Sequence, residues 1–397
     1  MISAKEALSI IISSLPPKKV IRKHLTDSLG YSLAEDIYAD TDQPPFDKSA
    51  MDGFAVRFAD LNKMPAELEL VTTVAAGEIA GMAVAKGKTI KIMTGAPVPA
   101  GADTVVMKEM TKENDNKVVF MEKPGYKANI CFRGEDVKKG RKVIAKGTLI
   151  NPAIVGLLAT FGKTHPRVFA NPSLAVLATG SELVAINQKP KRSQIRNSNS
   201  YVLSAQLQQL GFQPDNLGIA RDSQKELESK LKAGLKKDAL IITGGVSTGD
   251  YDIVEPVLRK LGVKILFNAV AIKPGKPFVF GINKIGSGKC LIFALPGNPV
   301  SVFVTMHVFV KPALLKLAGV GITDGGYLKA KLSGGKLRQI GRQQYIPALL
   351  NEERNTVAPV EWHGSADLVG LAHANSLIAI PPDEIVRQGD YARIIKL

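Results

Sequence analysis

The sequence predicts a multidomain protein of the α/β and β classes, and three stretches carry that prediction. Between residues 53 and 134, short β-type runs are separated by glycine and proline, which is typical of a small β-rich domain. From residue 167 to about residue 319, short apolar strands alternate with helical patterns, as in an α/β domain built on a parallel sheet. Beyond residue 319, β runs punctuated by glycine and proline indicate a separate C-terminal β domain.

Composition places the chain among ordinary globular proteins. Its 397 residues are enough for two to four domains, and 45% are hydrophobic while 22% are charged. Two cysteines exclude a disulfide framework and fit a reducing compartment. The N-terminus lacks the apolar region of a signal peptide, and the longest apolar run, residues 300–310, is too short to span a bilayer. We therefore expect a cytoplasmic protein without a membrane partner.

The formal net charge of +16 raises the question of nucleic-acid binding. However, the basic residues are scattered, aromatic residues make up only 6% of the chain, and no nucleic-acid-binding motif is present. A positive field also concentrates small anionic substrates, which is the interpretation we prefer. The expectation is therefore no nucleic-acid partner.

The N-terminal part is expected to begin with helices and to continue as extended chain. Residues 1–30 have a helical pattern that prolines 16–17 interrupt, and residues 31–36 are a candidate second helix. Residues 43–56 contain two prolines that disfavour regular structure. Asp52 lies in this segment, for which a domain-connecting loop with capping aspartates is the alternative interpretation.

The elements that follow can be placed in order along the chain. Strands are expected at residues 67–74, 89–93 and 104–107, an acidic turn at 133–137, further strands over 139–150, and a helix at 153–161 that ends at Gly162. In the α/β stretch, strands are expected at residues 173–178, 216–220, 239–242, 263–267 and 290–295, the last closing a hairpin over 278–295. Helices are expected at residues 199–210, after residue 253, and from residue 300 to about residue 319. A further helix is expected to start at a capping box formed by Ser223 and Glu226 and to bury Leu227, Leu231 and Leu235.

The segment 239–252 has the clearest chemical pattern. A buried-type strand runs into Thr243–Gly249, a loop rich in glycine and hydroxyl residues, and a helix with Pro256 in its first turn follows. A strand, a glycine-rich turn and a helix start together form an anion site. Asp250 and Asp252 would repel a phosphate unless a cation lay between them, so the pattern suggests phosphate and a divalent metal; plain turn chemistry is the alternative.

Two other strand ends repeat this design. Thr179–Glu182 and Pro296–Pro299 also follow apolar strands and consist of small or turn-forming residues. In an open parallel sheet, ligands bind at the carboxyl ends of the strands. Three such turns in one domain therefore predict one shared site.

Eight stretches along the chain have a distinctive order and spacing: PPFDKSAMDGFAV, MTGAPVPAGADTVV, FRGEDVKKG, ATGSELV, RNSNS, ITGGVSTGDYD, AIKPGKP and LPGNPVS. Together they resemble the motifs of the molybdopterin molybdenumtransferase family, which is also related to the C-terminal part of gephyrin. The resemblance implies an elongated discontinuous domain (1–51 plus 139–168), an inserted β domain (52–138), an α/β molybdopterin-binding domain (169–318) and a C-terminal β barrel (319–397).

The resemblance also implies the chemistry and the partners. The family converts adenylylated molybdopterin and molybdate, with a divalent metal that is usually Mg²⁺, into molybdenum cofactor and AMP. It implies a homodimer whose site is completed by the β domain of the second subunit, and a separate molybdopterin adenylyltransferase upstream. Two alternatives stay open, a gephyrin-like scaffold or binding module and a pterin adenylyltransferase.

Site residues follow from the same resemblance, supported by the oxygen chemistry of Mg²⁺ and by the suitability of lysines for an oxyanion. The expected catalytic residues are Asp52, Asp136, Glu182, Asp252, Lys273 and Lys276. The expected metal ligands are Asp136, Glu182, Asp250 and Asp252. The expected substrate-binding residues are Thr94, Thr179, Gly180, Ser181, Asn197, Ser198, Asp222, Gly244, Gly245, Val246, Ser247, Gly249, Pro274, Gly275, Pro296, Gly297, Asn298 and Pro299.

Overall fold

The structure is a computed structural model that describes residues 1–221, 223–246, 253–285, 288–321, 326–338 and 341–397. The chain divides into two units, each described here by itself. The first contains residues 1–34, 147–153 and 165–397, and the second contains residues 35–146 and 154–164.

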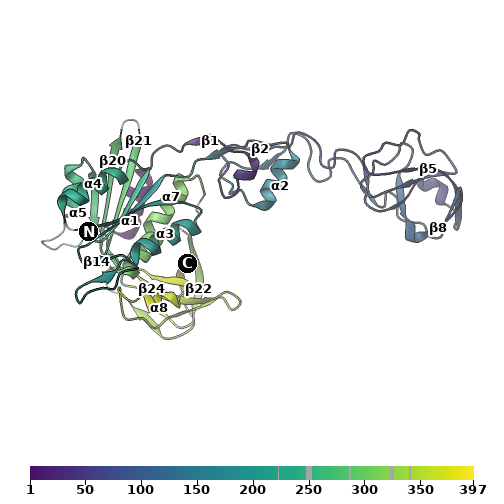
Figure 1. Ribbon diagram of the computed structural model, residues 1–397. Coiled ribbons are helices and arrows are strands. Elements are labelled where there is room, and N and C mark those ends of the chain that lie inside the picture. The colour runs from purple at the N-terminus through teal and green to yellow at the C-terminus, as the bar shows by residue number, and fades with distance from the viewer. Residues whose placement is uncertain (222, 247–252, 286–287, 322–325, 339–340) are drawn as a thin grey trace. The chain divides into compact units, whose positions relative to one another are not determined.

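A six-stranded sheet forms the centre of the first unit (Figure 1). Its order is β16 (Pro214–Ala220), β13 (Leu174–Thr179), β17 (Ala239–Thr243), β21 (Gly288–Leu295), β20 (Pro277–Ile285) and β18 (Lys264–Ala269). The first four strands are parallel, whereas β20 and β18 run antiparallel to their neighbours. The sheet is therefore mixed rather than wholly parallel, because the short connection between β20 and β21 permits only an antiparallel pair.

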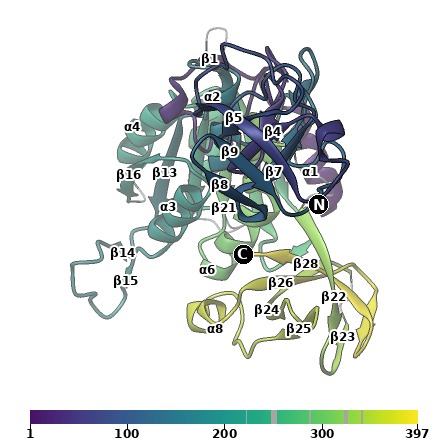
Figure 2. The same ribbon diagram turned by 90° about the vertical axis from the view of Figure 1, so that its right-hand side faces the viewer.

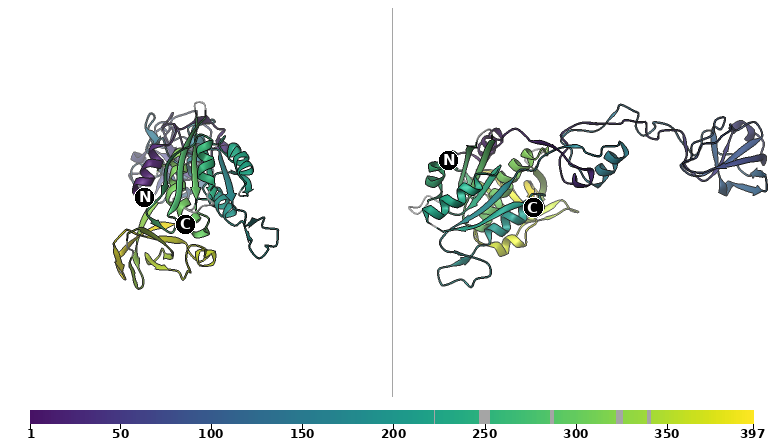
Figure 3. Two further views of the ribbon diagram at one scale, coloured as in Figure 1. Left: turned by 90° about the vertical axis from the view of Figure 1, so that its left-hand side faces the viewer. Right: turned by 45° about the horizontal axis from the view of Figure 1, so that its top comes forward.

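Helices cover both faces of this sheet (Figure 3). One face packs against α1 (Ala4–Ser13), α3 (Asn199–Gln209), α6 (Pro299–Thr305) and α7 (Lys311–Leu317). The other face packs against α4 (Gln224–Gly234) and α5 (Val254–Lys260). Alternate residues of β13 enter the two cores, Leu174 and Val176 on one side and Ala175 and Leu177 on the other. The continuous apolar runs of the sequence thus belong to strands that are buried on both faces.

A closed five-stranded barrel follows at the C-terminus (Figure 2). Its strands are β24 (Gln343–Asn351), β25 (Thr356–Pro359), β22 (Tyr327–Leu332), β28 (Tyr391–Lys396) and β26 (Ser376–Ile380), and β26 pairs again with β24. The short strand β19 (Ile272–Lys273) pairs in parallel with β24, which attaches a loop of the α/β domain to the barrel. Short elements complete this part: α8 (Leu368–Ala372) and the ribbon of β23 (Lys336–Arg338) with β27 (Ile385–Arg387).

The second unit is built on another six-stranded sheet. Its order is β7 (Thr104–Met107), β4 (Gly53–Val56), β6 (Lys88–Ile92), β5 (Ala66–Val74), β9 (Lys117–Phe120) and β8 (Thr111–Asn114). Two-stranded ribbons join β2 (Ile37–Tyr38) to β11 (Lys142–Ile144) and β3 (Lys48–Ser49) to β10 (Ile130–Cys131). The β-rich character predicted for this stretch is confirmed.

The N-terminal segment differs from its predicted helices. Only α1 is an α-helix, and the chain after the two prolines forms β1 (Val20–Arg22), which pairs with β12 (Arg167–Phe169). Residues 31–36 form no helix, because the backbone groups of Ser32 and Leu33 pair with Leu149 and Val168 instead. Proline and long-range pairing therefore overrode the local helical pattern.

Two further predictions need correction. Ser223 does stand at the N-cap of α4, but its hydroxyl makes no capping hydrogen bond, so the capping box is wrong. The helix predicted from residue 300 to about residue 319 is confirmed, but the apolar run 300–310 understated its apolar length: Pro299–Leu317 is the one described helix long and apolar enough to cross a membrane. However, 78% of its apolar window is buried inside the unit, where it serves as a core helix.

Candidate functional site

The three strand ends predicted to share a site do meet. β13, β17 and β21 are neighbours in the sheet, and they end at Thr179, Thr243 and Leu295. The Thr179 hydroxyl donates to the Thr243 carbonyl at 3.4 Å, and the Thr243 hydroxyl donates to the Pro296 carbonyl at 3.1 Å. Side-chain hydrogen bonds therefore join the turns across the carboxyl edge of the sheet.

Asn199, which we did not single out, joins two of these turns. Its amide Nδ2 lies 3.0 Å from the Thr243 hydroxyl and donates to the Gly297 carbonyl at 2.7 Å. Its Oδ1 is buried and finds no partner within the described part of the chain. The signal was present, because Asn199 belongs to the RNSNS motif at the start of α3.

Close packing explains the glycine that opens the second turn. Gly244 has φ +89°, and a Cβ there would lie 2.3 Å from the Thr179 carbonyl oxygen. Both observations exclude other residue types without a shift of backbone. Gly180 has φ +144°, and a Cβ there would lie 2.5 Å from a carboxylate oxygen of Glu182. The Glu182 side chain thus folds back over its own turn.

A pocket of about 760 Å³ opens above these turns. Eleven of the predicted site residues line it: Glu182, Gly244, Gly245, Val246, Lys273, Pro274, Gly275, Lys276, Pro296, Gly297 and Asn298. The residues come from four separate segments of the α/β domain. The structure therefore brings most of the predicted α/β site together.

Residues of the C-terminal domain complete the wall, and the sequence analysis missed them. They are Arg342, Gln344, Trp362, Gly364 and Ser365, to which the α/β domain adds Ile272, Pro277 and Ser301. The Asn298 amide donates to the Ser365 hydroxyl at 2.7 Å, which fixes one edge of the junction. Only the tertiary fold brings these two segments together, so no local pattern indicated them.

The electrostatic character of the pocket is positive. Lys273, Lys276 and Arg342 face one acidic wall residue, Glu182, among the described residues that line it. Trp362 adds a flat apolar surface and Ser301 a hydroxyl. Three cations against one carboxylate suit an anion with several oxygen atoms.

Other predicted residues of the α/β domain lie behind or beside the pocket. Thr179 and Gly180 support the first turn, and Ser198 and Pro299 stand at the starts of α3 and α6. Asn197 is buried and exchanges two hydrogen bonds with Ser200, at 2.9 and 3.2 Å, so its amide holds the start of α3.

Ser181 lines a different pocket of about 920 Å³, together with Lys189, Lys191, Arg221 and Glu226. This pocket is lined in part by the short strand β14 (Leu183–Val184), which pairs with β15 (Ile195–Arg196); Figure 2 labels both strands. The residue next to Glu182 in the chain thus faces another basic cavity.

Part of the predicted site lies outside the described residues: Asp222, Ser247, Gly249, Asp250 and Asp252. Among the residues that are described, no group of three or more His, Cys, Asp or Glu side chains is arranged to hold a metal ion. The predicted metal ligands therefore stay a prediction.

Asp52, Thr94 and Asp136 lie in the second unit. The backbone N–H and the hydroxyl of Thr94 both donate to Asp52 Oδ1 at 2.8 Å, and the Lys108 ammonium lies 3.8 Å from Oδ2. The backbone hydrogen bond from Thr94, followed by that from its hydroxyl, lowers the pKa of Asp52. Asp136 is exposed in the turn that follows Gly134. The structure thus pairs two predicted residues that are 42 positions apart.

Three family models match the chain in succession. Residues 2–162 match the MoeA N-terminal region (domain I and II), residues 175–316 match a probable molybdopterin binding domain, and residues 329–397 match the MoeA C-terminal region (domain IV).

Individual relatives are similar over nearly the whole chain. The molybdopterin molybdenumtransferase of Staphylococcus epidermidis is 37% identical and that of Staphylococcus aureus 35%, each over 96% of this chain and 91% of the relative. The crystal structure of a molybdopterin biosynthesis MoeA protein from Pyrococcus horikoshii is 30% identical, with a TM-score of 0.83 and full coverage of both chains.

Proposed function

The chain belongs to the MoeA family and has the role of a molybdopterin molybdenumtransferase in molybdenum-cofactor biosynthesis, and from this premise we propose its finer reaction. In this proposal the substrates are adenylylated molybdopterin and molybdate, and the products are molybdenum cofactor and AMP. The observation that supports it most is the basic pocket at the strand ends, where Lys273, Lys276 and Arg342 face Glu182.

In the proposed reaction, Lys273 and Lys276 bind molybdate. Both ammonium groups are carried by one turn, held by Pro274 and Gly275, at the pocket wall. Molybdate is a hard dianion, and a compact ammonium is a strong point-charge partner for such an oxyanion. Arg342 offers a planar fork of donors to the same anion or to the phosphate of the nucleotide.

The turn that begins at Gly244 would hold the phosphate through the N–H groups after Gly244, whose own N–H donates to the Leu295 carbonyl at 3.1 Å. Because a glycine turn exposes backbone N–H groups, it can bind phosphate oxygens without a positive side chain. Glu182 is the carboxylate of the pocket wall, and proteins commonly hold Mg²⁺ by one or two carboxylates together with substrate phosphates. Glu182 supports this proposal as one carboxylate ligand, and Asp136, Asp250 and Asp252 are the further proposed ligands. When bound, Mg²⁺ would neutralise charge on the phosphoanhydride.

We also propose a homodimeric, cytoplasmic enzyme that receives its pterin nucleotide from a separate adenylyltransferase. The motivation for the dimer is that Asp52 and Asp136 belong to a different unit from the pocket, yet the family resemblance assigns them to the same reaction. The four-domain division with boundaries near residues 52, 138, 168 and 318 is part of the same proposal. Light scattering at micromolar concentration that found only monomer would contradict the dimer.

The decisive experiment measures AMP release from adenylylated molybdopterin with molybdate and Mg²⁺. Lys273→Ala and Lys276→Ala should each raise the molybdate concentration needed for half-maximal rate about tenfold, while binding of the pterin nucleotide persists. Lys264→Ala, an exposed lysine of β18 outside the pocket, is the matched control. No AMP release by the wild type would favour a scaffold role over the enzyme.

The proposed metal role has its own test. Asp252→Asn keeps the size and polarity of the side chain but removes its charge. AMP release should collapse at limiting Mg²⁺ while nucleotide binding persists, because the glycine turn does not need the metal. Normal turnover by this variant at limiting Mg²⁺ would remove Asp252 from the set of ligands.

A further inference from the structure

A separate basic pocket lies on the other side of strand β24 from the candidate active site, distinct also from the cavity at Ser181. The side chains of a strand alternate between its two faces. Along this strand and the residue before it, Arg342 and Gln344 line the pocket described above, whereas Gln343 and Tyr345 line a separate cavity of about 720 Å³. One strand therefore forms a wall of both cavities.

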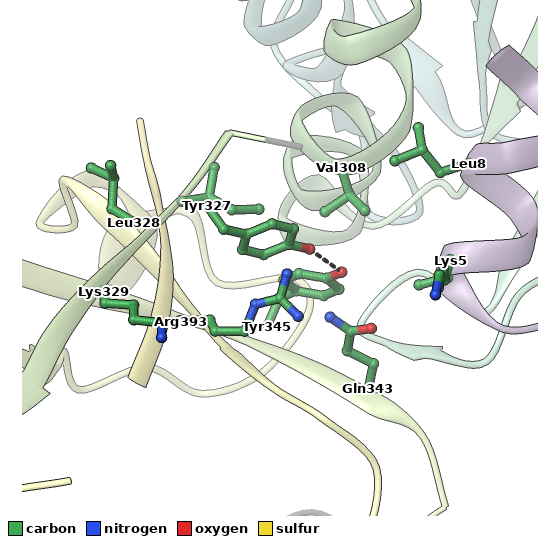
Figure 4. A pocket seen from close by; sticks show the side chains of 11 residues that line it. Lys5, Leu8, Val308, Tyr327, Leu328, Lys329, Gln343, Tyr345 and Arg393 are labelled. Atoms are coloured by element: carbon green, nitrogen blue, oxygen red, sulfur yellow. Dashed lines mark hydrogen bonds between the residues drawn. The ribbon is translucent and has the colours of Figure 1, made fainter. Parts of the chain in front are cut away.

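Segments distant in sequence build this cavity (Figure 4). Helix α1 contributes Ala4, Lys5 and Leu8, the core helix contributes Val308, and the barrel strands β22, β24 and β28 contribute the remainder of the wall. Figure 4 shows Tyr327, Tyr345, Arg393 and Gln343 gathered at the centre, with Lys5 on one side and Lys329 on the other.

The charge of the cavity is one-sided. Lys5, Lys329 and Arg393 line it, and no acidic side chain does so among the described residues. Within the same part of the chain, no carboxylate lies within ion-pair distance of any of the three. Arg393 instead lies 4.2 Å from the centre of the Tyr327 ring. Three cations facing one space without a counter-charge repel one another, so an anion placed there would relieve that repulsion.

Hydrogen-bond donors and apolar surface lie beside these cations. The hydroxyls of Tyr327 and Tyr345 are 3.0 Å apart, so one donates to the other and the acceptor retains a proton for a third group. Tyr345 is fully buried, and that burial raises the pKa of its hydroxyl, which therefore stays protonated. Leu8 and Val308 supply an apolar surface on which a flat ligand body could rest.

We propose that this cavity is a second ligand site, which binds a small organic anion with a flat apolar body and a phosphate or carboxylate group. Its volume lies within the range of about 300–1,000 Å³ typical of small-molecule sites. The anionic group would lie among Lys5, Lys329 and Arg393, and the body against Tyr327 and Leu8, with the buried Tyr345 supporting Tyr327 from behind. An inorganic ion alone would leave the apolar wall exposed to water.

The test uses the fluorescent aromatic anion anilinonaphthalene sulfonate as its probe, titrated into the full chain. The protein carries Lys273→Gln and Lys276→Gln, which weakens anion binding in the candidate active site; comparison of the variants below then assigns the remaining probe binding. In this background, Arg393→Gln should weaken probe binding about fivefold to tenfold, and Lys5→Gln with Lys329→Gln should do so by at least as much.

Controls and competitors decide the outcome. Lys331→Gln removes the same charge from the same strand β22 at a residue outside the cavity, and should leave probe affinity within about twofold. Displacement of the probe by AMP would identify a phosphate ligand, and displacement by benzoate a carboxylate ligand. The proposal would be overturned if the Arg393→Gln variant and the Lys5→Gln/Lys329→Gln variant both bound the probe as tightly as Lys331→Gln does. If Arg393→Gln folded poorly, the variant at the two exposed lysines would decide the question by itself.

Discussion

Replacing Asn199 by alanine should damage substrate binding more than the chemical step. The Asn199 amide contacts the Thr243 hydroxyl and the Gly297 carbonyl, and Asn199 is not among the residues of the pocket wall. Each hydrogen bond contributes about 1 kcal/mol net, so the two together hold the end of β17 and the turn after β21 in place by about 2 kcal/mol. If substrate had to restore the whole of that geometry, its affinity would fall by about thirtyfold.

The expected loss is smaller than this upper bound. The Oδ1 atom of Asn199 is buried without a partner in the described chain, so its removal offsets part of the cost. We expect KM for the pterin nucleotide to rise about fivefold to tenfold, with kcat changed less than about threefold. Steady-state AMP release measures both, and Gln208→Ala on the exposed side of α3 is the control. A fall in kcat of about a hundredfold at saturating substrate would refute the supporting role assigned here.

Three further predictions concern titratable groups. Burial lowers the pKa of His307 from 6.5 to about 4, so the unfolded chain takes up a proton at higher pH than the folded chain does. The free energy of unfolding therefore falls as the pH drops from about 6.5 to about 4, by about 2 kcal/mol at pH 5. Thermal melts at about pH 7 and pH 5 should show this loss of stability in the wild type and not in His307→Gln. Burial raises the pKa of the Cys290 thiol to about 12, so a thiol reagent at about pH 8 should label the half-buried Cys131 and spare Cys290 until the protein unfolds. The hydrogen bonds from Thr94 lower the pKa of Asp52, so this carboxylate should stay ionised from about pH 5 to 8. In Thr94→Val, carbon NMR titration should show the pKa of Asp52 move back up toward its ordinary 3.8.

The α/β core could be predicted because its determinants are local. Apolar runs of four to six residues, each followed by glycine or proline, mark β13, β17 and β21 in the sequence as clearly as in the structure. Their parallel pairing brings the carboxyl ends to one edge, which is why the three turns could be assigned to one site before any coordinates were known.

The rest of the site depends on contacts that leave no local trace. Trp362 and Ser365 lie in a loop after β25 whose sequence has no recognisable motif. They reach the pocket because β26 pairs with β24 and closes the barrel, and the Asn298 amide then donates to the Ser365 hydroxyl. The failed helix at residues 31–36 has the same cause, because the pairing of Leu33 with Val168 joins segments 135 residues apart. A short-range sequence pattern indicates which secondary structure a segment favours locally, whereas long-range pairing decides which structure the segment adopts in the fold.

The junction between the α/β domain and the barrel therefore has two consequences for function. The pairing of β19 with β24 places Lys273 beside Gln344, so the turn that carries both lysines is held by the barrel as well as by its own sheet. The same strand presents Gln343 and Tyr345 to the cavity behind. A shift of β24 that improved ligand contacts in one cavity would also move the wall of the other, because the side chains on both faces of a strand move with the same backbone. A ligand in either cavity would contact this one strand, so coupling between the two cavities would require that the two ligands favour different positions of β24.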